Sequence, residues 1–246
     1  MSWEWQIFCK ETTTGEVVQG CLGRGADYTY LNWIFKAWGW TLSVAALSLV
    51  VALVVGSLIG LLRTVPSKTL ARFGEAWTEV FRNIPLLVQI FIWYHVIPAI
   101  FPVLKTAVPS FVLVVLALGL FTSARIGEQV KAGINTLSRG QRYAGLAVGM
   151  TLPQTYRYVL LPMAFRIVIP PMTSEAMNIV KNSSVAFAVS IPELAQFAQQ
   201  ASEETARFEE IFIPVTFLYF VSAFAVNRVA KFIEARVRIP GTIGGK

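Results

Sequence analysis

Long apolar stretches without a charged residue dominate the chain. Four of them contain no Asp, Glu, Lys or Arg, and they cover residues 37–62, 83–104, 106–124 and 211–227. A helix needs about 20 apolar residues to cross the hydrocarbon core of a bilayer, and about 17 is the lower limit. A soluble domain can bury one run of this length in its core, but not four in succession. The pattern therefore predicts an all-α, polytopic membrane protein.

A fifth span is predicted in a less uniform stretch. Glu175 and Lys181 are the only charged residues between Arg166 and Pro192. A charge inside the membrane costs about 2.5–3.5 kcal/mol on insertion scales, so these side chains are expected to face protein or solute rather than lipid. We predict about five transmembrane helices, at 38–62, 82–102, 108–131, 166–190 and 210–230. They form a spanning domain at 38–232, after an N-terminal segment at 1–37 and before a tail at 233–246.

The distribution of Lys and Arg predicts the orientation. The formal net charge is +7, and most basic residues lie on one side, at Arg63, Lys68, Arg72, Arg82, Arg125, Lys131, Arg139, Arg142, Arg157, Arg166, Arg228, Lys231, Arg236, Arg238 and Lys246. The short loops of the other side hold Lys105 and Arg207. Because positive residues are retained in the cytoplasm, the N-terminus is predicted to be periplasmic and the C-terminus cytoplasmic. The basic residues form no separate domain, which argues against a nucleic-acid partner.

Two cysteines, Cys9 and Cys21, lie in the N-terminal segment. An oxidising compartment outside the membrane would allow a disulfide between them, and two free thiols are the alternative. No histidine or further cysteine lies nearby in the sequence, so no metal site is expected.

A polar segment at about 138–165 separates the third and fourth predicted spans. Residues 140–149 read GQRYAGLAVG, and residues 159–162 read VLLP. The glycine at position 149 allows a turn between two short helices. Apolar residues recur at Leu146, Val148, Val159 and Leu160. Such an amphipathic element suits docking into a groove of another protein, and an ordinary surface loop is the alternative.

The spacing of this segment resembles the so-called EAA loop of bacterial ABC importer permeases. That loop runs Glu-Ala-Ala, three residues, Gly, nine residues, Ile-x-Leu-Pro, and here Tyr143 and Gly145 depart from it. The resemblance implies a coupling helix that contacts a cytoplasmic ATPase. The predicted coupling residues are Tyr143, Ala144, Gly145, Gly149, Leu161 and Pro162.

Three further segments resemble the polar amino-acid permeases within this family. They read RNIPLLVQ at 82–89, SARIGE at 123–128 and KNSSV at 181–185. The overall pattern is most similar to the permeases of glutamate/aspartate importers. The resemblance implies a bacterial inner-membrane location, two copies of an ABC ATPase, a homologous second permease, a periplasmic solute-binding protein and an amino-acid solute.

The chain is predicted not to be an enzyme. The phosphate-binding pattern G-x-x-x-x-G-K-[ST] is absent, so ATP would be used by the partner ATPase and no cofactor is expected on this chain. An ion-coupled secondary amino-acid transporter is the alternative, and it would use intramembrane carboxylates such as Glu128 and Glu175. Such transporters usually contain internal repeats, and none is visible here.

A polar face on the fourth predicted span indicates where a solute could pass. At about 100° per residue, Glu175, Asn178, Lys181 and Asn182 fall within one arc of the helix. This face suits a solute path, or a hydrogen-bonded network that joins helices.

Arg125 and Glu128 lie one turn apart near the inner end of the third predicted span. Either they form a local ion pair, or Arg125 binds a solute carboxylate bidentately. The predicted path residues are Arg125, Glu128, Glu175, Asn178, Lys181 and Asn182.

Overall fold

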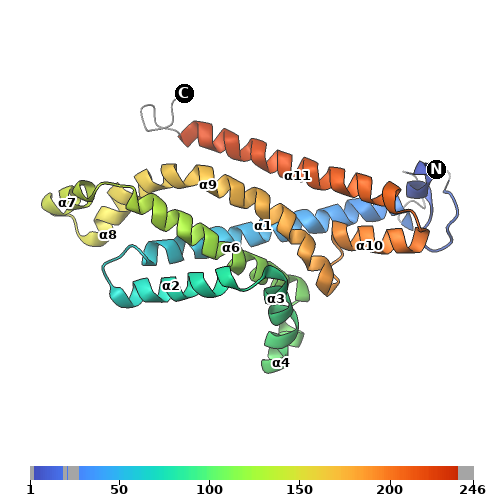
Figure 1. Cartoon of the computed structure of the whole chain (residues 1–246), viewed down its shortest axis with the longest axis horizontal. Coiled ribbons are helices and arrows are strands. Elements are labelled where there is room, and N and C mark those ends of the chain that lie inside the picture. Colours follow the sequence, from blue (N-terminus) through green and yellow to red (C-terminus); the bar gives the residue numbers. More distant parts are fainter. Residues whose placement is uncertain (1–2, 19–20, 22–27, 238–246) are drawn as a thin grey trace.

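The computed structural model describes residues 3–18, 21 and 28–237, and it contains helices but no β-strand in these ranges. Four long helices run side by side along the longest axis (Figure 1). They are α1 (Tyr30–Leu62), α6 (Ser110–Asn135), α9 (Leu161–Asn182) and α11 (Phe208–Val237). The all-α prediction is confirmed. The predicted tail lies outside the described residues from position 238 onward, as do Arg238 and Lys246.

Three of the described helices, α1, α6 and α11, are long and apolar enough to cross a membrane. Helix α9 overlaps the predicted span at 166–190 but ends at Asn182, and a 3₁₀ helix (Ser183–Val189) continues it. Pro170 and Pro171 lie inside α9, where each removes a backbone hydrogen bond. The polytopic prediction is therefore confirmed. The described helices supply three candidate spans, or up to four if one bent pair counts as a span, whereas about five were predicted.

The second span, predicted at 82–102, is not one straight helix. Helix α2 (Lys68–Asn83) and the segment 86–100 are bent by 103° at the break, and together they make at most one broken span. After the bend follow α3 (Leu86–Phe91), a π-helical turn (Ile92–Val96), α4 (Ile97–Ile100) and α5 (Val103–Ala107). Pro85 accounts for the break, because a residue before proline is disfavoured in helical conformation.

Helices α1 and α6 approach closely because glycines face each other's backbones. A Cβ atom on Gly60 would lie 2.6 Å from Val130 Cβ and 2.7 Å from the Gly127 carbonyl oxygen. A Cβ atom on Gly56 would lie 2.7 Å from the Ser123 carbonyl oxygen. Small residues at such a contact let two membrane helices pack by van der Waals attraction along their length. This contact fixes the position of α6, which carries Arg125.

Residues 193–210, which lie between the fourth and fifth predicted spans, are largely helical. Helix α10 (Leu194–Thr205) begins after Glu193, whose side chain accepts a hydrogen bond from the Gln196 backbone N–H. The apolar face of α10 accounts for its order, because Leu194 and Phe197 are fully buried against the start of α1.

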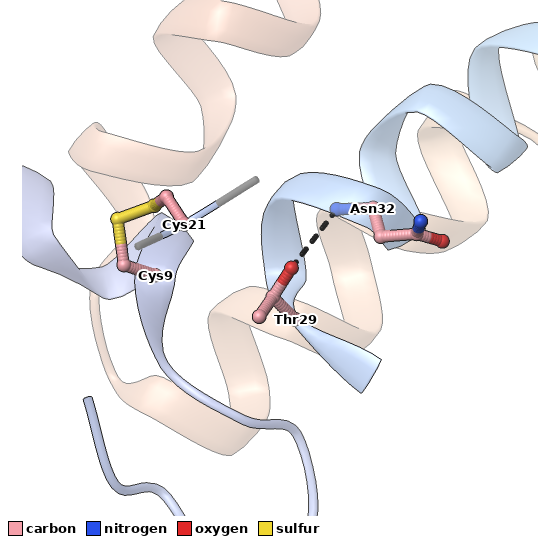
Figure 2. The surroundings of a disulfide bond; sticks show 4 residues. All are labelled: Cys9, Cys21, Thr29 and Asn32. Atoms are coloured by element: carbon pink, nitrogen blue, oxygen red, sulfur yellow. Dashed lines mark hydrogen bonds between the residues drawn. A yellow bond between two sulfur atoms is a disulfide. The ribbon is translucent and has the colours of Figure 1, made fainter. Parts of the chain in front are cut away.

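The N-terminal segment packs at the same end of the molecule as α10 (Figure 1). The structure joins Cys9, which ends a short 3₁₀ helix (Trp5–Cys9), to Cys21 in a disulfide (Figure 2). Thr29 caps α1 by accepting a hydrogen bond from the Asn32 backbone N–H at 3.3 Å. Glu4 reaches Arg207 at 2.9 Å, which ties this segment to the start of α11.

Candidate functional site

Arg125 of α6 and Glu175 of α9 form an ion pair between two long helices. The Arg125 Nη1 and Glu175 Oε2 atoms lie 3.6 Å apart. The Glu175 side chain is 10% exposed, whereas the Arg125 side chain is 44% exposed. The Arg125 side chain therefore contacts a buried carboxylate while part of it stays accessible. Because a guanidinium has five N–H donors, it retains capacity for a second carboxylate.

Glu175 is held by α6 through a second side chain. The Gln129 amide, one turn after Arg125, donates a hydrogen bond to Glu175 Oε1 at 3.2 Å. Glu175 Oε2 is buried and accepts no hydrogen bond, because its distance to Arg125 is too long for one. A buried carboxylate oxygen without a hydrogen bond raises the free energy of the folded state. The Arg125–Glu175 contact is therefore a weak one, which another partner of Arg125 can replace.

The other predicted path residues of α9 lie beyond Glu175 on the way to the 3₁₀ helix. Asn178 and Asn182 are half-buried, and Lys181 is exposed. The ion pair and the hydrogen bond of Glu175 go to α6 rather than to these three residues. The structure therefore groups Glu175 with Arg125, while the rest of the predicted polar face continues along α9.

Glu128 does not pair with Arg125. It accepts a hydrogen bond from Arg63 Nη1 at 2.8 Å and lies 3.9 Å from Arg82. Arg63 also donates to the Thr78 hydroxyl at 3.1 Å, and its side chain is only 5% exposed. Positions 125 and 128 differ by about 60° around the helix, which turns Arg125 toward α9 and Glu128 toward α1 and α2. Glu128 thus joins three helices.

The predicted coupling segment forms two short helices at the end of the molecule opposite to the N-terminal segment (Figure 1). Helix α7 (Arg139–Ala147) is followed by Gly149, whose φ of +85° only glycine adopts without strain. Helix α8 (Leu152–Thr155) begins with a capping box between Thr151 and Gln154. The segment is therefore an ordered helix–turn–helix, as its sequence pattern predicted.

Helix α7 packs on α8 at a glycine and exposes its apolar side. A Cβ atom on Gly145 would lie 2.7 Å from Thr155 Cγ2, so the alanine usual at this point of the EAA loop would need a displacement of Thr155. Ala144 is exposed, as are Tyr143, Leu146 and Val148, and Val148 reaches 74%. Contiguous exposed apolar side chains are typical of a protein interaction site.

The coupling segment leads directly into α9, the helix that carries Glu175. A π-helical turn (Tyr156–Leu160) leads from α8 directly into α9, which starts at Leu161 and Pro162. The Tyr156 hydroxyl donates a hydrogen bond to the Thr64 carbonyl oxygen at 2.7 Å, just beyond the end of α1. Helices α7 and α8 are therefore continuous with α9 and anchored to the end of α1.

Comparison with known proteins matches residues 52–239 to the family described as "Binding-protein-dependent transport system inner membrane component". The chain belongs to this family. It is 40% identical to the glutamate/aspartate import permease protein GltJ of Escherichia coli (strain K12), over 100% of this chain and 99% of the relative. It is 26% identical to the glutamate/aspartate import permease protein GltK of Escherichia coli O6:H1, over 80% of this chain and 89% of the relative.

The fold agrees with a solved transporter. A crystal structure described as an amino acid ABC transporter with histidines superposes with a TM-score of 0.73 and 26% identity. The match covers 84% of this chain and 95% of that chain. The chain is therefore a multi-pass permease of the inner membrane, and the recognition made from the EAA-like spacing is confirmed.

Sequence reasoning missed a buried polar cluster in this permease, near the start of α10. Glu193 is fully buried and accepts hydrogen bonds from the hydroxyl groups of Tyr219 at 2.5 Å and Thr41 at 3.4 Å. Burial raises the pKa of the Glu193 carboxyl group above its ordinary value, although these hydrogen bonds oppose the shift. The cluster fixes α10 to α1 and α11. Only the position of Glu193 directly before α10, as an N-cap, gave a signal in the sequence.

Proposed function

We propose that the chain is the membrane subunit of an ATP-driven importer of polar amino acids, glutamate and aspartate above all. The observation that carries the proposal is the full-length similarity to GltJ, at 40% identity without a large unmatched segment. The ordered coupling segment supports energisation by a separate ATPase. In this proposal the chain binds no nucleotide, and two ATPase copies hydrolyse ATP.

The exposed part of Arg125 receives a carboxylate of the solute. A solute carboxylate loses hydration on entering the membrane, at a cost of several kcal/mol, unless a fixed cation replaces the water. Arg125 supplies that cation, and its long contact with Glu175 leaves donors available. Asn178, Lys181 and Asn182 extend the polar path along α9, and Glu128 holds the neighbouring helices in place.

Coupling follows from the continuity between the coupling segment and α9. ATP-driven closure of the ATPases moves α7, and the π-helical turn transmits this motion to α9. Glu175 lies about 21 Å along α9 from Leu161, at a rise of about 1.5 Å per residue. A rigid-body shift of α9 therefore changes the Arg125–Glu175 separation, and with it the availability of Arg125 to the solute.

A second permease completes the pathway, because this chain exposes the Arg125 face rather than enclosing it. We propose a homologue as the second subunit, since GltJ and GltK are both named as glutamate/aspartate import permeases. A periplasmic solute-binding protein delivers the solute at the end formed by the N-terminal segment and α10. The coupling segment then faces the cytoplasm, in agreement with the basic residues around it.

Substitution in the turn of the coupling segment tests this proposal. Gly149→Val introduces a branched side chain at a φ of +85° and should separate ATP hydrolysis from uptake. Gly15→Val is the matched control, because Gly15 also has a positive φ of 72° and open space around it, but lies in the N-terminal segment. In proteoliposomes with the partner subunits, Gly149→Val should lose uptake at least tenfold while Gly15→Val keeps it. Normal ATP-driven uptake by Gly149→Val would overturn the coupling assignment.

A further inference from the structure

A polar pocket lies beneath the coupling segment, where the end of α6 meets α7 and the π-helical turn. It has a volume of about 390 Å³, and Thr64, Asn135, Ser138, Arg142 and Tyr156 form its polar lining. Arg142 is the only charged residue among the described residues that line it. The pocket thus places one guanidinium among hydroxyl and amide groups, a composition suited to an anion.

Arg142 is incompletely satisfied in this pocket. Its Nε atom is buried and has no hydrogen-bond partner. A buried donor without an acceptor costs about 1–3 kcal/mol, and more when the group is charged. Ser138, the N-cap of α7, lines the same pocket but makes no capping bond through its side chain. The positive end of the α7 dipole therefore adds to the attraction for an anion.

The charges along this part of the sequence have one sign. No Asp or Glu occurs between Gln129 and Ser174, whereas this stretch contains Lys131, Arg139, Arg142, Arg157 and Arg166. Retention of positive residues in the cytoplasm accounts for this excess. It does not account for a buried Arg142 Nε that has no acceptor within this chain, and an anionic partner would supply that acceptor.

We infer that the pocket receives an Asp or Glu side chain of the ATPase when the ATPase docks on the coupling segment. The inference rests on the proposed function, and it adds the chemistry of the contact. Where the EAA loop carries a glutamate, this chain has Tyr143, directly after Arg142. In the proposed contact the permease contributes the Arg142 guanidinium and the ATPase contributes the carboxylate. A carboxylate can bind a guanidinium through two parallel hydrogen bonds, and Nε is one of the donors.

A protein fits this site better than an anionic lipid headgroup. The exposed apolar side chains of Tyr143, Leu146 and Val148 belong to the same short helix or directly follow it. A protein groove covers these side chains and presents a carboxylate to Arg142 at the same time. A headgroup phosphate would neutralise Arg142 and leave the apolar side chains in water.

Charge reversal at Arg142 tests the inference in the complete transporter. Arg142→Glu should weaken retention of the ATPase on the purified permease by at least tenfold, and Arg142→Gln by less. Arg166→Glu is the matched control, since it makes the same charge change at an exposed residue of α9 outside the pocket. An Asp or Glu to Arg substitution in the docking groove of the ATPase should restore retention to Arg142→Glu and weaken it in the parent.

The outcomes separate this inference from the coupling role. If Arg142→Glu and Arg142→Gln retain the ATPase like the parent while Gly149→Val is uncoupled, the pocket has no ATPase carboxylate and the proposed function stands. If Arg142→Glu loses binding to vesicles of anionic lipid but not to the ATPase, the pocket binds a headgroup and the inference is wrong. If Arg142→Glu and Arg166→Glu lose retention of the ATPase equally, and the ATPase substitution does not restore it, the effect comes from net charge alone. That result would also overturn the inference.

Discussion

Replacing Arg125 with tyrosine removes the cation proposed to bind the solute carboxylate. The Arg125–Glu175 distance of 3.6 Å serves as the distance between Arg125 and a solute carboxylate. Two unit charges at this distance attract by about 4–5 kcal/mol at an effective dielectric constant of about 20. The Arg125 side chain is 44% exposed, so solvent screening reduces the usable part of this attraction. If about 1.4 kcal/mol of this attraction remains, its loss lowers the affinity for the solute carboxylate tenfold. Uptake of glutamate and aspartate by Arg125→Tyr should therefore fall by more than tenfold.

The assay is solute uptake into proteoliposomes that contain the same ATPase, second permease and solute-binding protein throughout. Arg125→Lys should retain part of the uptake, because an ammonium group lacks the planar pair of donors. Basal ATP hydrolysis should persist in every variant, which shows that the complex is assembled.

Glu175 supplies the control for this substitution, because Arg125→Tyr also leaves a buried carboxylate without its cation. Glu175→Gln alone should retain more uptake than Arg125→Tyr, since it leaves Arg125 available to the solute and removes only the carboxylate that competes for it. The double variant should transport as poorly as Arg125→Tyr. If the double variant recovers uptake, the loss came from the unpaired Glu175. If Arg125→Tyr transports glutamate as well as the parent, selectivity resides elsewhere, most simply in the solute-binding protein.

Three further predictions concern packing, topology and pH. Gly60→Val places a side chain against Val130 and should lower the free energy of unfolding in detergent by about 1–3 kcal/mol. Gly39 has open space around it, so Gly39→Val should leave the stability unchanged. Equal melting temperatures of the two variants would contradict the α1–α6 packing. After reduction, a membrane-impermeant thiol reagent should label Cys9 and Cys21 in intact spheroplasts, and labelling only after lysis would reverse the topology. Because burial raises the pKa of Glu193, its stabilising contribution should be present below its ordinary pKa and fall as pH rises through the raised value. Glu193→Gln should flatten that pH dependence of the melting temperature, and an unchanged slope would exclude Glu193 as its source.

The long helices were predictable because their signal is local. Helices α1, α6 and α11 each overlap an uncharged run of the sequence that is long enough to span a bilayer, and no tertiary contact is needed to find these runs. The break before α3 also had a local signal in Pro85, but the uncharged run continues across the proline. Hydropathy alone therefore could not distinguish one straight span from a bent pair.

The contact between Arg125 and Glu175 could not be predicted from the sequence. Arg125 and Glu175 were identified singly, because charges inside apolar runs are costly and conspicuous. Their pairing depends on how α6 and α9 face each other, which is set by packing between helices distant in sequence. The spacing of Arg125 and Glu128 instead favoured a local pair, and the structure joins Glu128 to Arg63. The turn at Gly149 was predicted because its positive φ is a property of glycine itself.

The source of energy for uptake tests the central claim most directly. The permease is reconstituted with its second permease, ATPase and solute-binding protein, and uptake of labelled glutamate is followed at constant internal ATP. The account predicts that uptake requires ATP and continues at the same rate after an ionophore collapses the proton and sodium gradients. Uptake that proceeds without ATP and stops when the gradients collapse would contradict it and identify an ion-coupled secondary transporter.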